Sequence, residues 1–381
     1  MRYYIISGEA SGDLHGSNLM KGIKQVDNQA EFRFWGGDLM AAEAPGLVRH
    51  YNETNFMGFA EVLANLRKVK ANLEFCKRDI QQWEADVVIL IDYPGFNLRI
   101  AEFAKSKDML VYYYISPKIW AWKESRIKKI KAYVDRMFVI FPFEVDYFKQ
   151  HNYPVIFAGN PTIDAIEEIL HQDDDFASFI RRNNLDNKPV VALMPGSRKQ
   201  EVDRHMEIML RVHKHFPDYQ FVIAAAPSLP PAYYEKFTRY EKVHMIYGNS
   251  YEVLKYAKAA LVTSGTATLE TALFRVPQVV CYKTSPLSFL IAKAFVKIKW
   301  ISLVNLIMNR EVVKELIQRD MSESRLVQEL NALLHNTDSR SQMLLEYDAL
   351  KEHLGGSGAS ERVAREMHLK LLSDLASIRE G

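Results

Sequence analysis

The 381-residue chain has little cysteine and almost no net charge. Its two cysteines, Cys76 and Cys281, lie far apart without metal-ligand or CxxC spacing. This indicates a reduced, intracellular protein and argues against a structural zinc site. Lysine and arginine number 49 and aspartate and glutamate 47, a formal net charge of +2. Such a balance argues against a globally basic protein that binds nucleic acid.

Long uncharged apolar runs are also absent. Spanning a bilayer takes roughly 18 such residues, and the best stretch, 286–308, is interrupted by Lys293, Lys297 and Lys299. The N-terminal MRYYIISGEASGD lacks the charged leader, apolar core and small-residue cleavage site of a signal peptide. We therefore expect a cytoplasmic protein whose contact with any membrane is peripheral.

Short apolar runs alternate with helical stretches throughout. They lack strict polar alternation, as expected of parallel strands covered by helices on both faces. A polar segment around 172–188 separates two series, which predicts an α/β protein of two Rossmann-like, doubly wound domains. The expected strands are RYYIIS near residue 2, DVVILID at 86, MLVYYYIS at 109, RMFVIF at 136, VIFA at 155, PVVALM at 189, YQFVIAAA at 219, VHMIYG at 243 and AALVTSG at 259.

The domain boundaries follow from these series. We place an N-terminal domain at 1–164, a C-terminal domain at 165–345, and terminal helices that cross back to the N-terminal domain at 346–381. Ligands of doubly wound sheets bind beyond the carboxyl ends of the strands. The residues directly after each run are therefore the candidates for chemistry.

Acidic residues follow two strands of the first domain. The loop SGEASGDLHG after the first strand carries Glu9 and Asp13, and Asp92 follows DVVILI just before Pro-Gly. Asp92 is a candidate general base; alternatively it bonds local backbone amides, as aspartate before a turn commonly does. The Glu9 loop is otherwise a plain capped turn. It is no dinucleotide fingerprint, because GxGxxG is absent.

Two small-residue turns in the second domain suit a nucleotide diphosphate. In PGSR (195–198), backbone amides precede a helix and Arg198 supplies a guanidinium fork. SGTAT (264–268) also opens into a helix, with Glu270 placed to accept ribose hydroxyls. An ordinary turn or cap explains either one alone. Two such turns in one domain favour a nucleotide site.

A series of motifs resembles one known family in its order. SGEASGDLHG, MGFAEVL, DYPGFN, SPKIWAW, FPFE, AGNP, MPGSR, SGTATLE and NREVVKELIQ look like the successive motifs of lipid-A-disaccharide synthases, over roughly residues 1 to 320. The resemblance implies a GT-B architecture whose two domains face a cleft. It also implies an inverting glycosyltransferase without metal or other cofactor, which joins UDP-2,3-diacylglucosamine to 2,3-diacylglucosamine 1-phosphate. The products would be the β-1,6-linked lipid A disaccharide 1-phosphate, a precursor of lipopolysaccharide, and UDP.

The resemblance also implies roles for individual residues. Asp92 would deprotonate the acceptor 6-hydroxyl, and Arg198 would stabilise the leaving diphosphate. The family commonly has His where Asn160 stands and Pro where Val304 stands. These departures affect the expected interdomain hinge at Gly159-Asn160-Pro161 and the donor loop. UDP would bind at Gly196, Ser197, Arg198, Ser264, Gly265, Thr266, Ala267, Thr268, Glu270, Asn305 and Gln318, and the acceptor at Glu9, Ser11, Asp13 and His15.

The acylated substrates imply contact with an anionic membrane surface, at the cytoplasmic face of the inner membrane. Apolar residues at helical spacing among basic ones are the preferred contact, although a core-facing helix has the same pattern. A homodimer is a further expectation. Competing functions are a UDP-N-acetylglucosamine 2-epimerase or another GT-B enzyme of UDP-sugars, and a non-catalytic nucleotide-sugar sensor. The proposed membrane residues are Phe59, Val62, Leu63, Leu66 and Val69.

Overall fold

The computed structural model describes residues 1–54, 66–121, 123–238, 240, 243–286, 289 and 299–380, with the backbone alone at Thr54, Leu66 and Glu380. The chain forms two compact units, here unit 1 (Met1–Asp164 with Leu354–Gly381) and unit 2 (Ala165–His353). The last helix of unit 2 runs unbroken to His353. The chain therefore re-enters unit 1 at Leu354 rather than at the expected residue 346.

Unit 1 contains one parallel sheet of seven strands among the described residues, in the order β3-β2-β1-β4-β5-β6-β7. The strands are β1 (Arg2–Ile6), β2 (Glu31–Gly36), β3 (Leu47–His50), β4 (Val87–Ile91), β5 (Leu110–Tyr114), β6 (Arg136–Val139) and β7 (Ile156–Phe157). The helices are α1 (Ala10–Val26), α2 (Asp38–Glu43), α3 (Tyr51–Thr54), α5 (Leu66–Trp83), α6 (Pro94–Lys105), η1 (Glu124–Arg126), α7 (Ile127–Tyr133), α8 (Pro142–Gln150) and α19 (Ala359–Glu380), with α9 (Thr162–Leu170) leading into unit 2.

Unit 2 repeats this arrangement with six parallel strands in its described part, in the order β10-β9-β8-β11-β12-β13. The strands are β8 (Val190–Met194), β9 (Gln220–Ala225), β10 (Val243–Tyr247), β11 (Ala257–Thr263), β12 (Gln278–Tyr282) and β13 (Lys314–Ile317). The helices are α10 (Phe176–Arg182), α11 (Lys199–Arg211), η2 (Val212–His215), α12 (Pro231–Tyr234), η3 (Glu235–Phe237), α13 (Ser250–Tyr256), α14 (Thr266–Leu273), α16 (Leu303–Met308), α17 (Glu323–His335) and α18 (Thr337–His353).

All nine expected strands are confirmed. Every residue of β4, β5 and β8 is buried, which is why these runs read as continuously apolar. The strands β2, β3, β12 and β13 were not predicted. Edge strands such as β3 and β13 are short and partly polar, LVRH and KELI, so their sequences carry little strand signal.

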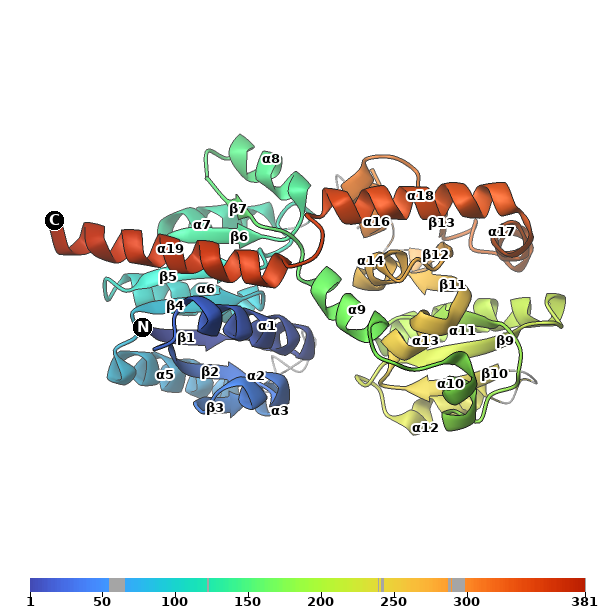
Figure 1. The fold of residues 1–381 in the computed structure, drawn as a ribbon, viewed down its shortest axis with the longest axis horizontal. Coiled ribbons are helices and arrows are strands. Elements are labelled where there is room, and N and C mark those ends of the chain that lie inside the picture. The colour runs from blue at the N-terminus through green and yellow to red at the C-terminus, as the bar shows by residue number, and fades with distance from the viewer. Residues whose placement is uncertain are drawn as a thin grey trace. The chain divides into compact units, whose positions relative to one another are not determined.

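The C-terminal helix α19 packs on the sheet of unit 1 beside α1 (Figure 1). A Cβ on Gly22 of α1 would lie 2.7 Å from the Cβ of Ala364, so the two helices approach closely. Asp374 accepts hydrogen bonds from Arg136 at 3.0 and 2.6 Å and from the Tyr112 hydroxyl at 2.7 Å. These bonds tie the end of the chain to β5 and β6.

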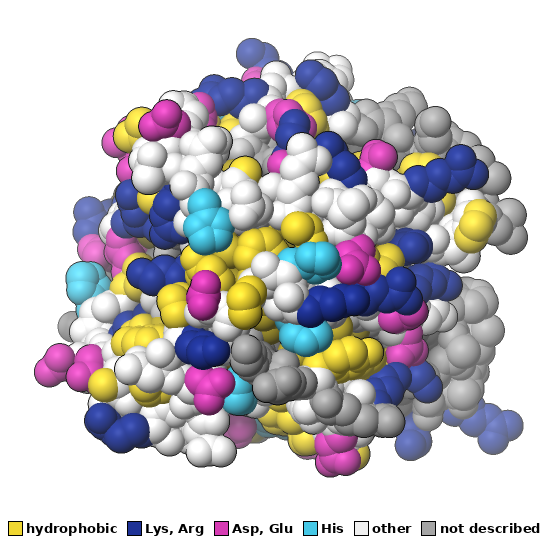
Figure 2. Space-filling view, turned by 90° about the vertical axis from the view of Figure 1, so that its right-hand side faces the viewer, with side chains coloured by type: hydrophobic (Ala, Val, Ile, Leu, Met, Phe, Trp, Pro, Cys, Tyr) yellow, Lys and Arg dark blue, Asp and Glu magenta, His cyan; other side chains and the backbone are white. Residues whose placement is uncertain are grey.

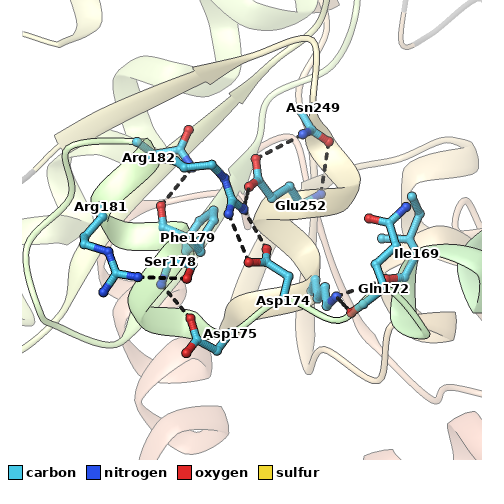
Figure 3. A network of polar contacts seen from close by, with 12 residues as sticks. Ile169, Gln172, Asp174, Asp175, Ser178, Phe179, Arg181, Arg182, Asn249 and Glu252 are labelled. Carbon is cyan, nitrogen blue, oxygen red and sulfur yellow. Dashed lines mark hydrogen bonds and ion pairs between the residues drawn. The ribbon is translucent and has the colours of Figure 1, made fainter.

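A polar network attaches the first segment of unit 2 to helix α13 (Figure 3). The Arg182 guanidinium donates to both oxygens of Asp174, at 2.9 and 2.6 Å, and to Glu252 on α13 at 2.5 Å. Asn249 caps α13 by accepting from the Glu252 amide at 3.3 Å. Lys255 on the same helix donates to the carbonyl of Gln172 at 2.9 Å. The segment after α9 is thereby fixed to α13.

Candidate active site

Asp92 lies at the carboxyl end of β4, in a turn held by its main chain. Asp92 and Tyr93 both have left-handed backbone, with φ of 41° and 47°, which is costly for residues other than glycine. The Asp92 amide donates to the Tyr114 carbonyl at 3.1 Å. The Asp92 carbonyl accepts from Asn97 Nδ2 at 2.8 Å and from the Tyr113 hydroxyl at 2.5 Å. These bonds fix the turn without using the carboxyl group.

The surroundings of the Asp92 carboxyl make it a stronger base than an ordinary aspartate. Burial, and after it the negative charge of Glu9, raise its pKa from 3.8 to about 6, against the opposing effects of Lys118, of the Tyr93 backbone amide and of Arg126. A carboxylate of this pKa is mostly ionised at neutral pH and accepts a proton more readily than a solvated one. General bases with a pKa near the working pH are the effective ones.

The Glu9 loop lies directly against the Asp92 turn. A Cβ on Gly8 would fall 2.4 Å from Cγ of Tyr93, so only glycine allows the two segments to come this close. Ser11 donates to Glu9 Oε1 at 2.7 Å. The structure thus brings Glu9, Ser11 and Asp92 together, because β1 and β4 are neighbours in the sheet.

The other two expected acceptor residues are positioned differently. Asp13 is buried, and its carboxylate accepts from the amides of Gly37 at 2.7 Å and of Leu39 and Met40 at 3.1 Å each. It therefore holds the start of α2. Nδ1 of His15 is buried and makes no hydrogen bond in the described part of the chain. Burial lowers the pKa of His15 to about 4, so its ring is neutral at neutral pH.

A buried glutamate that the residue-by-residue reading missed joins the loops after β5 and β6. Glu144 is 1% exposed and accepts from the amides of Ile140 at 3.2 Å and Phe141 at 3.0 Å. It also accepts from the Ser116 hydroxyl and from Trp120 Nε1. Burial raises its pKa to about 7. The spacing in FPFE, with Pro142 first in the helix and an acid two residues later, was the available signal.

In unit 2 the PGSR turn already holds an anion, the carboxylate of Glu201. Oε2 of Glu201 accepts from the amides of Ser197 and Arg198 at 3.3 Å each, and Oε1 accepts from Arg198 Nη1 at 3.1 Å. Gly196 has φ of +107°, and a Cβ there would lie 2.6 Å from Glu201 Oε2. Converging amides and a guanidinium are the groups that receive phosphate oxygens. The Arg198 side chain is 79% exposed, although it is paired with Glu201.

The SGTAT turn follows β11, the neighbour of β8 in the sheet, so both turns lie at the same edge. Two of its hydroxyls serve the fold. The Ser264 hydroxyl donates to the Ile301 carbonyl at 2.7 Å. The Thr268 hydroxyl donates to the Gly265 carbonyl at 2.8 Å and accepts from the Leu303 amide at 3.2 Å. What remains for a ligand is the backbone of this turn and the exposed side chain of Thr266.

The first turn of α14 offers that backbone. Thr266 and Ala267 are its first residues, and the opening amides of a helix have no acceptor within the helix. Glu270 lies one turn later and accepts from the Tyr251 hydroxyl at 3.3 Å. Burial raises the pKa of Glu270. Tyr251, on α13, is a second residue that the sequence reading missed, because nothing near Glu270 in the sequence points to it.

Asn305 and Gln318 are held by neighbouring backbone. Asn305 is fully buried, accepts from the Val313 amide at 3.0 Å and donates to Glu315 at 2.9 Å. Gln318 has φ of 54°, and its Oε1 accepts from the Thr284 amide at 2.9 Å. Asn305 thus orders the segment around α16. Gln318 joins the ends of β12 and β13.

The expected membrane residues lie largely outside the described residues. Phe59, Val62, Leu63 and the side chain of Leu66 lie outside the described part of the chain. Val69 is half-buried on α5. No helix in the described ranges is long and apolar enough to cross a bilayer. Figure 2 shows basic and acidic side chains interspersed over one face, with hydrophobic and histidine side chains toward its middle. In the same ranges no cluster of three or more His, Cys, Asp or Glu side chains is placed to hold a metal ion.

Comparison with known proteins decides the family. A family model described as lipid-A-disaccharide synthetase matches residues 3–366. The lipid-A-disaccharide synthase of Coxiella burnetii (strain Dugway 5J108-111) is 35% identical over 374 residues, 97% of this chain and 98% of the relative. That of Geobacter metallireducens is 36% identical over 370 residues, 95% of each chain. This chain belongs to the lipid-A-disaccharide synthase family. It is a glycosyltransferase of lipid A disaccharide synthesis.

Solved structures share the fold at low sequence identity. UDP-GlcNAc 2-epimerase from Methanocaldococcus jannaschii, in complex with UDP-GlcNAc and UDP, has a TM-score of 0.67 at 13% identity, covering 97% of this chain and 100% of that one. The Neisseria meningitidis epimerase bound to UDP-GlcNAc has a TM-score of 0.65 at 14% identity, with the same coverage. These likenesses confirm the GT-B type of two Rossmann-like domains. They concern the fold and carry no epimerase activity over to this chain.

Proposed function

We propose that this enzyme transfers 2,3-diacylglucosamine from UDP to the 6-hydroxyl of 2,3-diacylglucosamine 1-phosphate, with inversion at the anomeric carbon. The products are the β-1,6-linked lipid A disaccharide 1-phosphate and UDP. The observation that carries this proposal is Asp92, whose carboxyl has a pKa of about 6 at the carboxyl end of β4. Family membership supports the chemical class of both substrates.

The proposed reaction needs one base and no covalent intermediate. Asp92 takes the proton of the acceptor hydroxyl. At the same time the oxygen of that hydroxyl forms a bond to the anomeric carbon, and the bond from this carbon to UDP breaks. Negative charge then develops on the leaving diphosphate. Arg198 and the amides of the PGSR and SGTAT turns are the groups of unit 2 that would receive this charge. In this proposal Glu270, supported by Tyr251, binds the ribose.

For the diphosphate to bind, the Glu201 carboxylate has to leave the PGSR turn. It occupies two amides and the Arg198 guanidinium. Two anions competing for the same donors repel each other. We therefore expect Glu201 to rotate outward when UDP binds, which releases Arg198 toward the phosphates.

The decisive experiment supplies purified protein with UDP-2,3-diacylglucosamine and the monosaccharide 1-phosphate in detergent and follows UDP and disaccharide. Folded protein that binds UDP but forms no disaccharide would overturn the proposal. A parallel incubation with UDP-N-acetylglucosamine tests for 2-epimer formation, the alternative activity. Arg198→Ala should weaken UDP binding, and an unchanged affinity would remove Arg198 from the phosphate site.

Attachment to the cytoplasmic face of the inner membrane is part of the same proposal, as is a homodimer. The membrane attachment is supported by the acyl chains of the proposed substrates and by the apolar and basic pattern around residues 59–69. Sedimentation with vesicles containing anionic lipid tests the attachment, with Leu63→Glu as the disrupting variant. Leu345→Glu, an exposed leucine of α18, is the matched control. Equal binding by both variants would place the contact elsewhere, and light scattering gives the oligomeric state.

A further inference from the structure

A histidine beneath the two anion-binding turns of unit 2 has a complete set of partners. His205 on α11 is 0% exposed. Its Nδ1 lies 3.0 Å from the Pro195 carbonyl oxygen and 2.9 Å from Thr263 Oγ1. Its Nε2 lies 3.0 Å from the backbone nitrogen of Lys283. One imidazole therefore contacts three separate segments of the chain.

These three segments follow three neighbouring strands. Pro195 opens the PGSR turn directly after β8, and Thr263 is the last residue of β11, just before the SGTAT turn. Lys283 comes directly after β12. The order β8-β11-β12 places the three strand ends side by side. His205 thus lies where it can set the spacing between the two turns.

The partners also define the protonation state of the ring. A backbone N–H only donates, so Nε2 must accept from Lys283 and carries no proton. The neutral ring then has its proton on Nδ1, from which it donates to the Pro195 carbonyl and the Thr263 hydroxyl. An imidazolium would carry a proton on Nε2 as well. That proton would face the Lys283 N–H, and the bond between them would be lost.

We infer that His205 is a positioning residue, whose neutral ring holds the PGSR and SGTAT turns at the separation that a nucleotide diphosphate requires. The inference rests on the proposed UDP site and adds to it a residue that touches no ligand itself. Its action is indirect, through the carbonyl of Pro195 and the hydroxyl of Thr263. Without the His205 ring, both turns keep their hydrogen-bond donors, but these donors no longer converge on one diphosphate.

Acid should weaken the site through the same ring. Burial, the largest effect, and the nearby Arg204 lower the pKa of His205, while the Pro195 carbonyl and the Glu201 carboxylate act in the opposite direction. Because the folded pKa is below the ordinary value of 6.5, the ring stays neutral at neutral pH and becomes charged only at lower pH. UDP affinity should therefore hold near neutrality and fall in acid.

Equilibrium binding of UDP, measured by calorimetry, is the appropriate assay because it does not depend on Asp92. His205→Leu removes all three bonds, and we expect roughly a tenfold to hundredfold weaker UDP binding. His205→Gln keeps an acceptor for the Lys283 amide and should recover part of the loss. In turnover, KM for the UDP-sugar should rise more than kcat falls. His215→Gln, an exposed histidine paired with Glu323, is the control.

The pH dependence separates positioning from simple structural support. The ratio of UDP affinities, wild type over His205→Gln, should fall toward one as the pH drops, since the phosphate titration of UDP is common to both proteins. A ratio that stays constant with pH would overturn the inference. So would folded His205→Leu that binds UDP like wild type while Arg198→Ala binds weakly. Wild-type protein that binds no UDP would instead remove the proposed function.

Discussion

Replacing Asp92 by asparagine should strongly lower turnover and at the same time stabilise unit 1. The side chain keeps its shape. The hydrogen bonds described for the turn join the main chain of Asp92 to Tyr114, Asn97 and Tyr113, so the substitution leaves them in place. The variant should therefore fold. Loss of a general base lowers a rate by about 10²- to 10⁴-fold, and UDP binding should be unchanged because Asp92 lies in the other unit.

The size of the stabilisation follows from the pKa of Asp92. A rise from 3.8 to about 6, at 1.36 kcal/mol for each pH unit, amounts to at most about 3 kcal/mol. Between pH 3.8 and 6 the folded protein holds more protons on Asp92 than the unfolded chain does, so its stability falls as the pH rises through this window. Above pH 6 the full cost is present, and asparagine, which does not ionise, avoids it.

Thermal unfolding followed by tryptophan fluorescence measures this directly. By sequence, Trp300 is the one tryptophan of residues 165–353, so the signal reports mainly on unit 1. About 3 kcal/mol raises Tm by about 6–12 °C for a domain of this size. The gain should be seen near pH 7.5 and should vanish near pH 4.

Two outcomes would refute the reasoning about Asp92. The first is a gain in Tm that is absent at pH 7.5 or equal at both pH values. Either result would show that ionisation of the Asp92 carboxyl does not destabilise the folded protein. Normal turnover by Asp92→Asn would require another base. Asp86→Asn, at the amino end of β4, is the control and should change neither turnover nor the pH dependence of Tm.

Three further variants test other carboxylates of the two units. Glu9→Gln removes the second cause of the raised Asp92 pKa, so the acidic limb of kcat against pH should move below pH 6; an unmoved limb would show that the two groups are not coupled. Glu201→Gln should tighten UDP binding about fivefold in calorimetry, since a like charge at 4 Å costs about 1 kcal/mol even in water, whereas weaker binding would mean that Glu201 orders the turn instead. Glu144→Gln presents an amide N–H₂ to donors and should lower the unfolding free energy in urea by about 1–3 kcal/mol; equal stability would show that its four bonds are dispensable.

The sequence predicted the site best where a strand end determines position. Asp92 and Arg198 were placed correctly after β4 and β8, because residues after buried apolar runs line the carboxyl edge of a parallel sheet; their roles stay predictions. The strands themselves were found for the same reason, and the polar edge strands β3 and β13 were missed. Family motifs then gave Asp92 its expected role, which position alone left open between a base and a turn-forming aspartate.

What the sequence could not predict depends on pairs of residues that only folding brings together. Tyr251 reaches Glu270 from another helix. His205 contacts residues ten, 58 and 78 positions away. A histidine in an amphipathic helix gives no sign of such partners, because the helical period shows only that one side is buried.

The same physical rule explains why motif residues need not touch a ligand. A buried polar side chain must find hydrogen-bonding partners, and for Asp13 and Asn305 these are backbone groups of α2 and of the segment after α16. Both residues belong to motifs shared with the family, yet their polar atoms are already committed within the fold. Such residues shape a site by fixing the segments that present it. A substitution of either should therefore appear first as lost stability, and only through it as lost activity.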